Sequence, residues 1–281
     1  MNKEQLINNI TRGDIRLSFT SLEKFSISPK AFISYKLAKF EQTEAMLLGQ
    51  LVHMMVLEPD KVGTYFVEAP EVNGATKEGK AVWHDLYCQY VEQVPAEGFK
   101  MTIADIQTAI TASTGVSVLA AKTFQAARLR ADAILENPVA LQYIQGEAEV
   151  KLPEGFELFG LPFSGRADLV NFEDCYIMDI KTMADATRNN AAREIVKKKY
   201  HWQAAIYMEA FGINDFGFVC VDGAGEVSVH ALSEGMKNQA LAEMRMYCER
   251  FKEAVQKPEL FNQSQEFYTG GVNIIDVYVK G

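Results

Sequence analysis

Two short runs in the second half of the chain place acidic and basic side chains where metal-assisted hydrolysis could occur. One run reads Gly-Arg-Ala-Asp and ends at Asp168; the other begins at Asp179, after ten intervening residues, and reads Asp-Ile-Lys. Because side chains alternate between the faces of a strand, Asp179 and Lys181 would share one side while Ile180 faces the core. A turn at residues 171–174 would fold the strands into a hairpin and bring Asp168 beside Asp179.

Two converging carboxylates with an amine beside them suit a hard, oxygen-binding cation such as Mg²⁺. The cation would polarise a phosphoryl oxygen and lower the pKa of a bound water, while Lys181 would orient that water or stabilise the developing charge. The alternative is two surface aspartates and a solvated lysine on an edge hairpin. Asp-x-Lys is a common tripeptide, so its spacing alone favours this alternative, and the choice depends on the neighbouring residues.

A polar helix face follows the second run. Gln203 and Tyr207 are four residues apart, so they would lie on one face of a helix. Lys199 would extend that face by one turn if the helix begins early enough. These three side chains could hydrogen-bond phosphate oxygens and hold a nucleic-acid backbone in register.

The densest basic cluster of the chain precedes this face. It would bind DNA phosphates, or it would be a solvated helix end, which is the usual fate of such a run. Its members are Arg188, Arg193, Lys197, Lys198 and Lys199.

A histidine also stands in the most apolar part of the sequence. Gly49 and His53 lie one helical turn apart within the apolar stretch 45–57. A histidine in such a place is more often a hydrogen-bonded core residue than a ligand. The glycine beside it, however, would let another backbone or a metal site approach closely.

Apolar periodicity and turn residues predict the elements that must position these side chains. We expect helices at 41–57, 81–94, 102–118, 120–135 and 233–256, and a helical stretch after residue 182 that ends at Phe211, with Gly212 as its terminator. A polar loop is expected at 73–80. The predicted strands are 147–152, 161–170, 175–182, 216–221, 226–232 and 272–279. This order predicts a mixed α/β fold in which helices flank a central sheet.

Composition limits the function classes. The 281 residues are 48% hydrophobic and 23% charged, with a net charge of −9, which is typical of a globular protein and excludes a histone-like basic binder. The four cysteines form no Cys-x-x-Cys pair, so neither a zinc ribbon nor an iron–sulfur cluster is expected. No signal peptide or membrane-length apolar run is present in the sequence, which predicts a cytoplasmic protein without membrane contact.

Taken together, these motifs resemble the PD-(D/E)XK nuclease superfamily, and within it the RecE-like (exonuclease VIII) branch related to the RecB nuclease domain and lambda-type exonucleases. The resemblance covers residues 17–212 and rests on five motifs in order: Gly-x-x-x-His, a strand glutamate, Gly-Arg-Ala-Asp, Asp-x-Lys and Gln-x-x-x-Tyr. It implies a restriction-endonuclease-like core, with a central mixed sheet flanked by helices. We expect one nuclease domain over 1–281, with a mostly helical insertion at about 60–140.

The resemblance also implies a role for each matching residue. Metal ligands would be Asp168, Asp179, the backbone carbonyl of Ile180 and His53. Lys181 would be the catalytic lysine, Gln203 and Tyr207 would organise the site and contact DNA phosphate, and Arg166 would join the basic cluster in binding DNA. Glu149 is the preferred strand glutamate, although Glu147, two residues away on the same side, is an open alternative.

The activity implied is a Mg²⁺-dependent deoxyribonuclease, with Mn²⁺ as a substitute, that resects linear double-stranded DNA from the 5′ end. Such an enzyme would form a homo-oligomeric ring and leave a 3′ single strand for an annealing protein of the RecT type. Two alternatives stay open: a structure-specific or restriction-type endonuclease, and a catalytically silent DNA-binding module. The intact acids and lysine argue against the silent module. The tail after about residue 258 matches no motif of the family.

Overall fold

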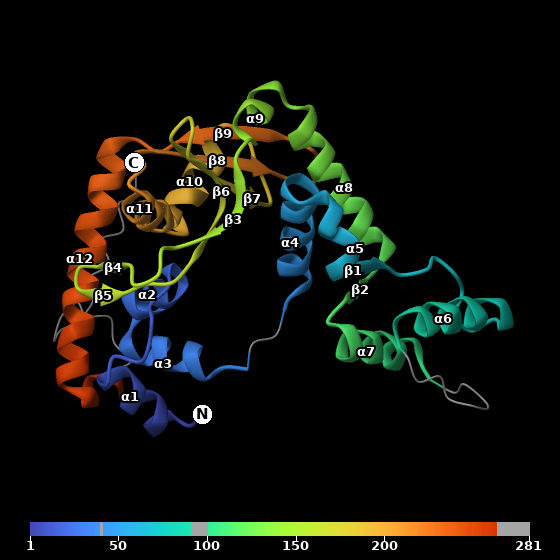
Figure 1. Cartoon of the computed structure of the whole chain (residues 1–281), viewed down its shortest axis with the longest axis horizontal. Coiled ribbons are helices and arrows are strands. Elements are labelled where there is room, and N and C mark those ends of the chain that lie inside the picture. The colour runs from blue at the N-terminus through green and yellow to red at the C-terminus, as the bar shows by residue number, and fades with distance from the viewer. Residues whose placement is uncertain (40–41, 92–100, 263–281) are drawn as a thin grey trace, which may run out of the picture.

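A five-stranded mixed sheet forms the centre of the molecule in the computed structural model, which describes residues 1–39, 42–91 and 101–262 (Figure 1). Its strand order is β3-β6-β7-β8-β9, with β7 and β8 parallel and every other neighbouring pair antiparallel. The predicted mixed sheet is therefore confirmed. The strands are β3 (Glu147–Lys151), β6 (Arg166–Asn171), β7 (Tyr176–Thr182), β8 (Asp215–Val221) and β9 (Val227–Ala231).

Helices cover both faces of this sheet because its strands are apolar on both sides. Ile177 of β7 packs into the cluster formed with α1–α3 and α10–α12, whereas Met178 and Ile180 pack into the cluster under α4, α8 and α9. On the first face the helices are α1 (Lys3–Thr11), α2 (Phe19–Ile27), α3 (Pro29–Leu37), α10 (Arg188–Lys197), α11 (Tyr200–Phe211) and α12 (Glu234–Gln256). On the second face they are α4 (Glu44–Leu57), α8 (Ala121–Glu136) and α9 (Pro138–Tyr143).

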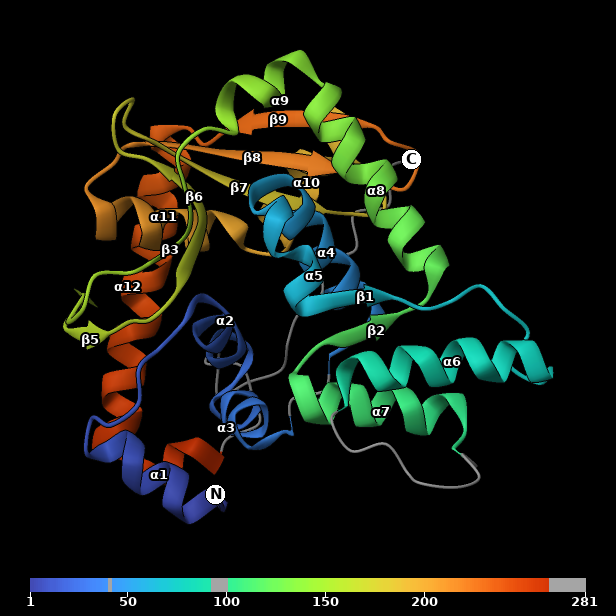
Figure 2. The same ribbon diagram turned by 45° about the vertical axis from the view of Figure 1, so that its right-hand side comes forward.

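A smaller hydrophobic cluster lies to one side of the sheet, where α6 and α7 pack against each other (Figure 2). The short parallel pair β1–β2 connects them to α4 and α8. The elements of this region are η1 (Pro59–Lys61), α5 (Val62–Tyr65), β1 (Phe66–Glu68), α6 (Lys77–Tyr90), α7 (Ile103–Thr114) and β2 (Ser117–Leu119). Two further small elements lie near α12, namely the hairpin β4 (Glu157–Leu158) with β5 (Leu161–Pro162), and η2 (Pro258–Asn262).

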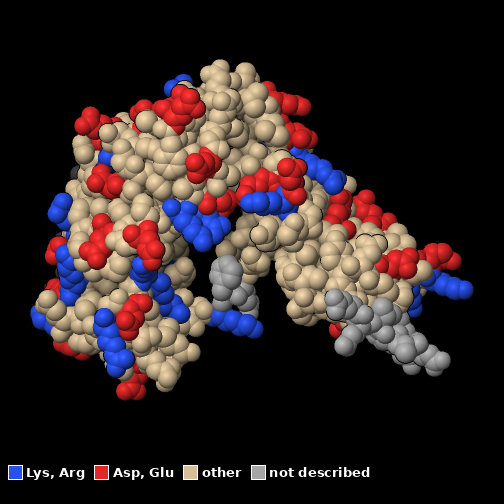
Figure 3. Space-filling view, viewed as in Figure 1, with Lys and Arg blue, Asp and Glu red and all other residues tan. Residues whose placement is uncertain are grey.

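The molecule has the shape of an arch. Helices α1–α3 and the pair α6–α7 stand on opposite sides of an opening below α4 (Figure 1). The space-filling view is hollowed between these two parts, and side chains of both charges gather at the head of the hollow (Figure 3). None of the helices in the described ranges is long and apolar enough to cross a membrane.

Two sequence expectations about local structure need correction, and a third falls on residues that the structure does not describe. The helix expected at 102–118 ends at Thr114, because Gly115 takes a left-handed φ of +76°, and the next residues form β2. The loop expected at 73–80 is half helical, since the Thr76 hydroxyl accepts a hydrogen bond from the Gly79 N–H at 3.0 Å and begins α6 at Lys77. The strand expected at 272–279 lies outside the described residues.

The helical stretch expected before Phe211 is present. It consists of two helices, because Lys199 has a left-handed φ of +55° and separates α10 from α11. Gly212 ends α11 with a φ of +67°, as expected.

Candidate metal and catalytic centre

The candidate site begins where β6 and β7 separate. Their pairing ends at Leu169 and Met178, and the same register places Asp168 across from Asp179, as the predicted hairpin requires. At this point the Ile180 N–H donates to Asp168 Oδ2 at 2.8 Å. The Asp168 carboxylate thus replaces a backbone carbonyl as the acceptor and is fixed where β6 and β7 separate.

Asp179 is fully buried, with 0% of its surface exposed. Its Oδ2 lies 2.5 Å from Lys181 Nζ as an ion pair, and no other residue in the described ranges donates a hydrogen bond to either of its oxygens. Burial and the charge of Asp168 raise the pKa of Asp179 to about 6. A buried carboxylate with so few partners costs stability, and a bound divalent cation would relieve that cost.

His53 enters the site from α4. Its Nδ1 lies 3.3 Å from Asp168 Oδ2. Burial would lower the pKa of His53, but the neighbouring carboxylate of Asp168 has the larger effect and raises it. Burial would raise the pKa of Asp168, but His53 and Lys181 together have the larger effect and lower it. Gly49, one turn earlier, faces β7, where an added Cβ would lie 3.4 Å from Thr182 Oγ1.

Glu149 completes the acidic side of the site. The register of β3 with β6 places it across from Asp168, although its φ of +57° interrupts the ladder there. His53, Glu149 and Asp168 each offer a ligand atom, and these atoms lie within 4.8 Å of one another. Glu149 Oε2 also pairs with Arg166 Nη1 at 3.1 Å. Glu147 is exposed and stands outside this group, because the positive φ of Glu149 breaks the alternation that would align the two glutamates.

Helix α11 supplies the polar partners of the lysine. Lys181 Nζ donates to Gln203 Oε1 at 3.1 Å, and Gln203 Nε2 lies 3.3 Å from the Tyr207 hydroxyl. That hydroxyl donates to the Arg166 carbonyl at 2.7 Å, which ties α11 to β6. Burial raises the pKa of Tyr207 to about 12, so the phenol keeps its proton and acts as a donor.

The lysine is held as a cation. Burial opposes its charge, but Asp179 and Asp168 outweigh burial and raise the pKa of Lys181. The ring of Tyr200 lies 4.6 Å from Lys181 Nζ, a contact that the sequence interpretation missed. Its signal was available, because Tyr200 precedes Gln203 by three residues on the same helix.

The basic cluster lies mainly on α10. Lys197 Nζ and Lys198 Nζ each lie 3.2 Å from a carboxylate oxygen of Glu194, and the exposed Arg188 and Arg193 belong to the same helix. Lys198 Nζ also lies 6.0 Å from the centre of the Tyr200 ring.

The expectation that Lys199 continues the face of Gln203 and Tyr207 is wrong. Lys199 lies in the left-handed turn before α11 and not within the helix. Its Nζ donates to Ser26 Oγ at 2.6 Å and lies 4.4 Å from the Trp202 ring. The change of backbone direction at this residue therefore turns its side chain toward α2 and α12.

Two cavities are lined by residues of the candidate site. A cavity of about 500 Å³ is bordered by His53, Glu149, Arg166, Lys61 and the half-exposed Tyr65. A smaller one, of about 100 Å³, lies beside Gln203 and is lined largely by hydroxyl-bearing side chains, among them Ser18, Thr20, Ser164 and Tyr207. The larger cavity therefore offers space for a ligand beside His53 and Glu149.

Comparison with known proteins gives one family and one shared fold. A family model described as a PDDEXK-like domain of unknown function (DUF3799) matches residues 18–259. A crystal structure of a candidate exonuclease from Eubacterium rectale is 15% identical with a TM-score of 0.56, and the match covers 92% of this chain and 85% of that one. This likeness bears on the fold alone and confirms the expected helix-flanked mixed sheet.

Two other solved structures are more distant. A phage-related exonuclease from Haemophilus somnus 129PT is 13% identical over 71% of this chain and 94% of that chain, with a TM-score of 0.34. An alkaline exonuclease from Laribacter hongkongensis is 13% identical over 64% of this chain and 96% of that chain, with a TM-score of 0.29. Both scores are too low to establish a common fold. No curated protein matches the sequence.

Proposed function

The chain belongs to the family of PDDEXK-like domains of unknown function (DUF3799), and from this premise we propose that it is a metal-dependent deoxyribonuclease. The family match confirms the resemblance to the PD-(D/E)XK nuclease superfamily, and the fold shared with a candidate exonuclease agrees with its RecE-like branch.

One observation carries the proposal. Where β6 and β7 separate, the carboxylates of Asp168 and Asp179 meet the amine of Lys181, and the fully buried Asp179 has this lysine as its ion-pair partner. Two carboxylates crowded beside one lysine in a buried site suit a bound cation, which would relieve their mutual repulsion.

The donor set fits a hard divalent cation. Asp168, Asp179, His53 and Glu149 would hold it, with the backbone carbonyl of Ile180 as a further ligand. When bound, Mg²⁺, or Mn²⁺ in its place, would polarise a phosphoryl oxygen and lower the pKa of the attacking water.

The chain's own residues then position the reaction. Lys181, kept protonated by the two aspartates, would orient the water and stabilise the charge that develops on the phosphate. Gln203 fixes the lysine amine through its 3.1 Å hydrogen bond. Tyr207 holds the Arg166 backbone beside Asp168 and, with Gln203, would contact a DNA phosphate.

The preferred substrate is linear double-stranded DNA, degraded from the 5′ end in the cytoplasm. Family resemblance supports this choice, and so does the description of the structure from Eubacterium rectale as a candidate exonuclease. The DNA backbone would be held by Arg166, Arg188, Arg193, Lys197 and Lys198, whereas the amine of Lys199 is bound to Ser26. A homo-oligomeric ring and a RecT-type annealing protein would complete the activity.

The test compares two DNA substrates. Linear duplex with a 5′ label and closed circular duplex are incubated with the protein, with Mg²⁺ or with EDTA. The proposal expects metal-dependent loss of the linear DNA alone, with early release of the label.

Each other result has a defined meaning. Cleavage of the circle would make the protein an endonuclease, and late release of the label would reverse the polarity. Cleavage in EDTA would contradict the metal requirement. The absence of any cleavage, with DNA still bound, would favour the silent DNA-binding module.

A further inference from the structure

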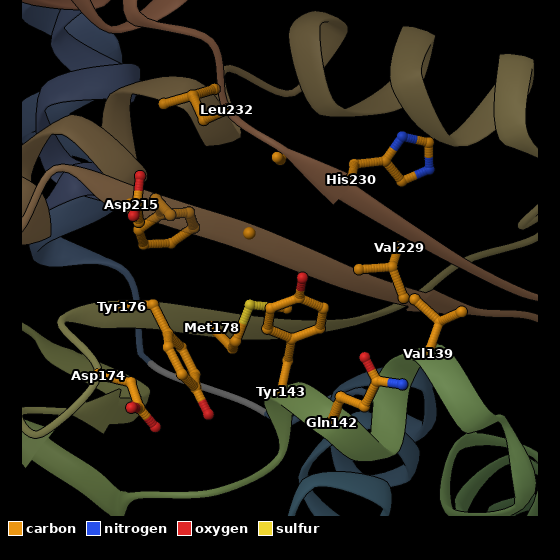
Figure 4. Close-up of a pocket in the computed structure, with 13 residues that line it drawn as sticks. Val139, Gln142, Tyr143, Asp174, Tyr176, Met178, Asp215, Val229, His230 and Leu232 are labelled. Atoms are coloured by element: carbon orange, nitrogen blue, oxygen red, sulfur yellow. The ribbon is translucent and has the colours of Figure 1, made fainter.

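A third cavity lies at the other end of β7 from Lys181. It has a volume of about 590 Å³, within the usual range for ligand sites, and lies between α9 and the strands β7, β8 and β9 (Figure 4). Tyr176 and Asp215, the first residues of β7 and β8, line it, so it is separate from the acids of the candidate active site.

The walls of this cavity are apolar and aromatic. The rings of Tyr143 and Tyr176 meet edge to face at a centroid distance of 5.7 Å, and Tyr143 points from α9 toward the strands (Figure 4). Met178 forms part of the floor, and Gly217 allows it to lie there, because an added Cβ would come within 2.6 Å of Met178 Sδ. Val139 and Tyr143 are 50% and 40% exposed, which leaves the apolar wall open to solvent.

The charge of the lining has one sign. Asp174 and Asp215 are exposed carboxylates on one side of the cavity (Figure 4), and no Lys or Arg is among the described residues that line it. This potential repels a DNA phosphate and attracts a lysine or arginine side chain.

The cavity also borders an open strand edge. Strand β9 is the last in the sheet order, and no strand in the described ranges pairs with its outer edge. The Leu232 N–H donates to the Phe216 carbonyl at 2.8 Å, so the hydrogen-bonded pairs of this ladder involve residues 228, 230 and 232. The backbone N–H and C=O groups of Val229 and Ala231 therefore point outward, and both residues line the cavity.

We propose that this cavity and the outer edge of β9 form a docking site for an extended peptide segment of a protein partner, one that carries an apolar side chain close to a lysine or arginine. The segment would add a strand to β9 through Val229 and Ala231, as in β-augmentation. Its apolar side chain would enter beside Tyr143, and its cation would meet Asp215 and Asp174. The inference is independent of the proposed nuclease activity.

The test uses random nine-residue peptides displayed on phage. They are selected on the wild-type protein, on Asp215→Lys, and on Glu154→Lys, a matched charge reversal at an exposed turn remote from the cavity lining. Wild type and Glu154→Lys should enrich peptides with Lys or Arg within two residues of an aromatic or aliphatic side chain. Asp215→Lys should enrich none of them.

A second measurement tests the strand pairing on the unaltered protein. The best enriched peptide and its copy with methylated backbone amides are compared by fluorescence anisotropy. Methylation should weaken binding at least tenfold, and Asp215→Lys should do the same to the unmethylated peptide, while cleavage of naked linear DNA by Asp215→Lys stays within twofold of wild type.

Several outcomes would overturn the proposal. These are the absence of enrichment, enrichment of acidic peptides, equal enrichment on Asp215→Lys, and unchanged affinity after methylation. A wild-type dimer that Asp215→Lys dissociates would also overturn it, because a second copy of this chain would then be the occupant. If neither wild type nor Asp215→Lys cleaves DNA, the nuclease proposal is refuted, and the peptide-binding result is judged independently of it.

Discussion

Helices α10 and α11 follow each other in the chain and both carry polar side chains at helical spacing, but they differ in what those side chains meet. On α11, Gln203 and Tyr207 are hydrogen-bonded to Lys181 and to the backbone of β6. On α10, Lys197 and Lys198 pair with Glu194 of their own helix at the surface. The left-handed turn at Lys199 separates the two environments. Helical spacing therefore identifies residues that share a face, and only the tertiary contacts decide which face reaches the acids.

The largest expected effect is on the α11 side, where Lys181 is held by Gln203. Lys181→Ala should lower the cleavage rate of linear duplex at least a thousandfold, about 4 kcal/mol of barrier, because the charge at the reacting phosphate loses its fixed cation. DNA affinity measured by anisotropy should change less than threefold. Unimpaired turnover in this variant would remove the lysine from the mechanism.

The α10 side should affect binding and not turnover. Lys198 Nζ shares the Tyr200 ring with Lys181, whereas Lys197 has no such contact among the described interactions. We expect Lys198→Glu to weaken DNA affinity about tenfold, and Lys197→Glu about threefold, since exposed phosphate contacts are lost. The slope of log affinity against log salt should flatten by about one for each charge removed. If the DNA affinities and salt slopes of both variants equal those of wild type, Lys197 and Lys198 are merely solvated.

A smaller effect is expected at the link between α11 and β6. Tyr207→Phe removes the 2.7 Å hydrogen bond to the Arg166 carbonyl and leaves the ring packing intact. The unfolding free energy should fall by about 1 to 2 kcal/mol, because a part-buried carbonyl loses its donor. Cleavage should slow about tenfold if this link positions Asp168. A stable variant with wild-type cleavage would show that the hydroxyl has no positioning role.

The smallest effect is expected at the anchor of α10. Asp222 accepts the N–H of Ala186, just before that helix, at 3.0 Å, and also those of Ala224 and Glu226. Burial opposes the charge, but these three donors hold the pKa of Asp222 below its ordinary value. A lowered folded-state pKa adds stability above the unfolded pKa, about 3.9, and this stability is lost as the pH falls through the folded value.

Asp222→Asn should therefore lower the unfolding free energy by about 1 kcal/mol at neutral pH. The unfolding free energy of this variant should also fall less than that of wild type as the pH is lowered. Chemical denaturation at neutral and acidic pH measures both. Cleavage should stay within twofold of wild type, in contrast to Tyr207→Phe. A fall identical to that of wild type would mean that Asp222 is not a stabilising carboxylate.

Local sequence patterns predicted much of the candidate site, and the features that they missed depend on tertiary contacts. The alternation of Asp179 and Lys181 and the hairpin beside Asp168 follow from strand periodicity and a turn, both of which are local. The left-handed residues Glu149 and Lys199 could not be predicted, because neither is a glycine and their φ values of +57° and +55° depend on the surrounding packing. Tyr200, by contrast, could have been identified from its helical spacing to Gln203, although its contact with Lys181 depends on where that side chain points.

We propose above all that the site where β6 and β7 separate binds a divalent cation, with which the protein hydrolyses DNA. The most direct measurement is the cleavage rate of linear duplex by wild type and by Asp179→Asn, each titrated with Mg²⁺ from an EDTA-treated start, with folding checked by circular dichroism. We expect Mg²⁺-dependent cleavage by wild type and a loss of at least a thousandfold in a folded Asp179→Asn protein. Equal Mg²⁺-dependent cleavage by the two proteins would contradict it and move the active centre elsewhere.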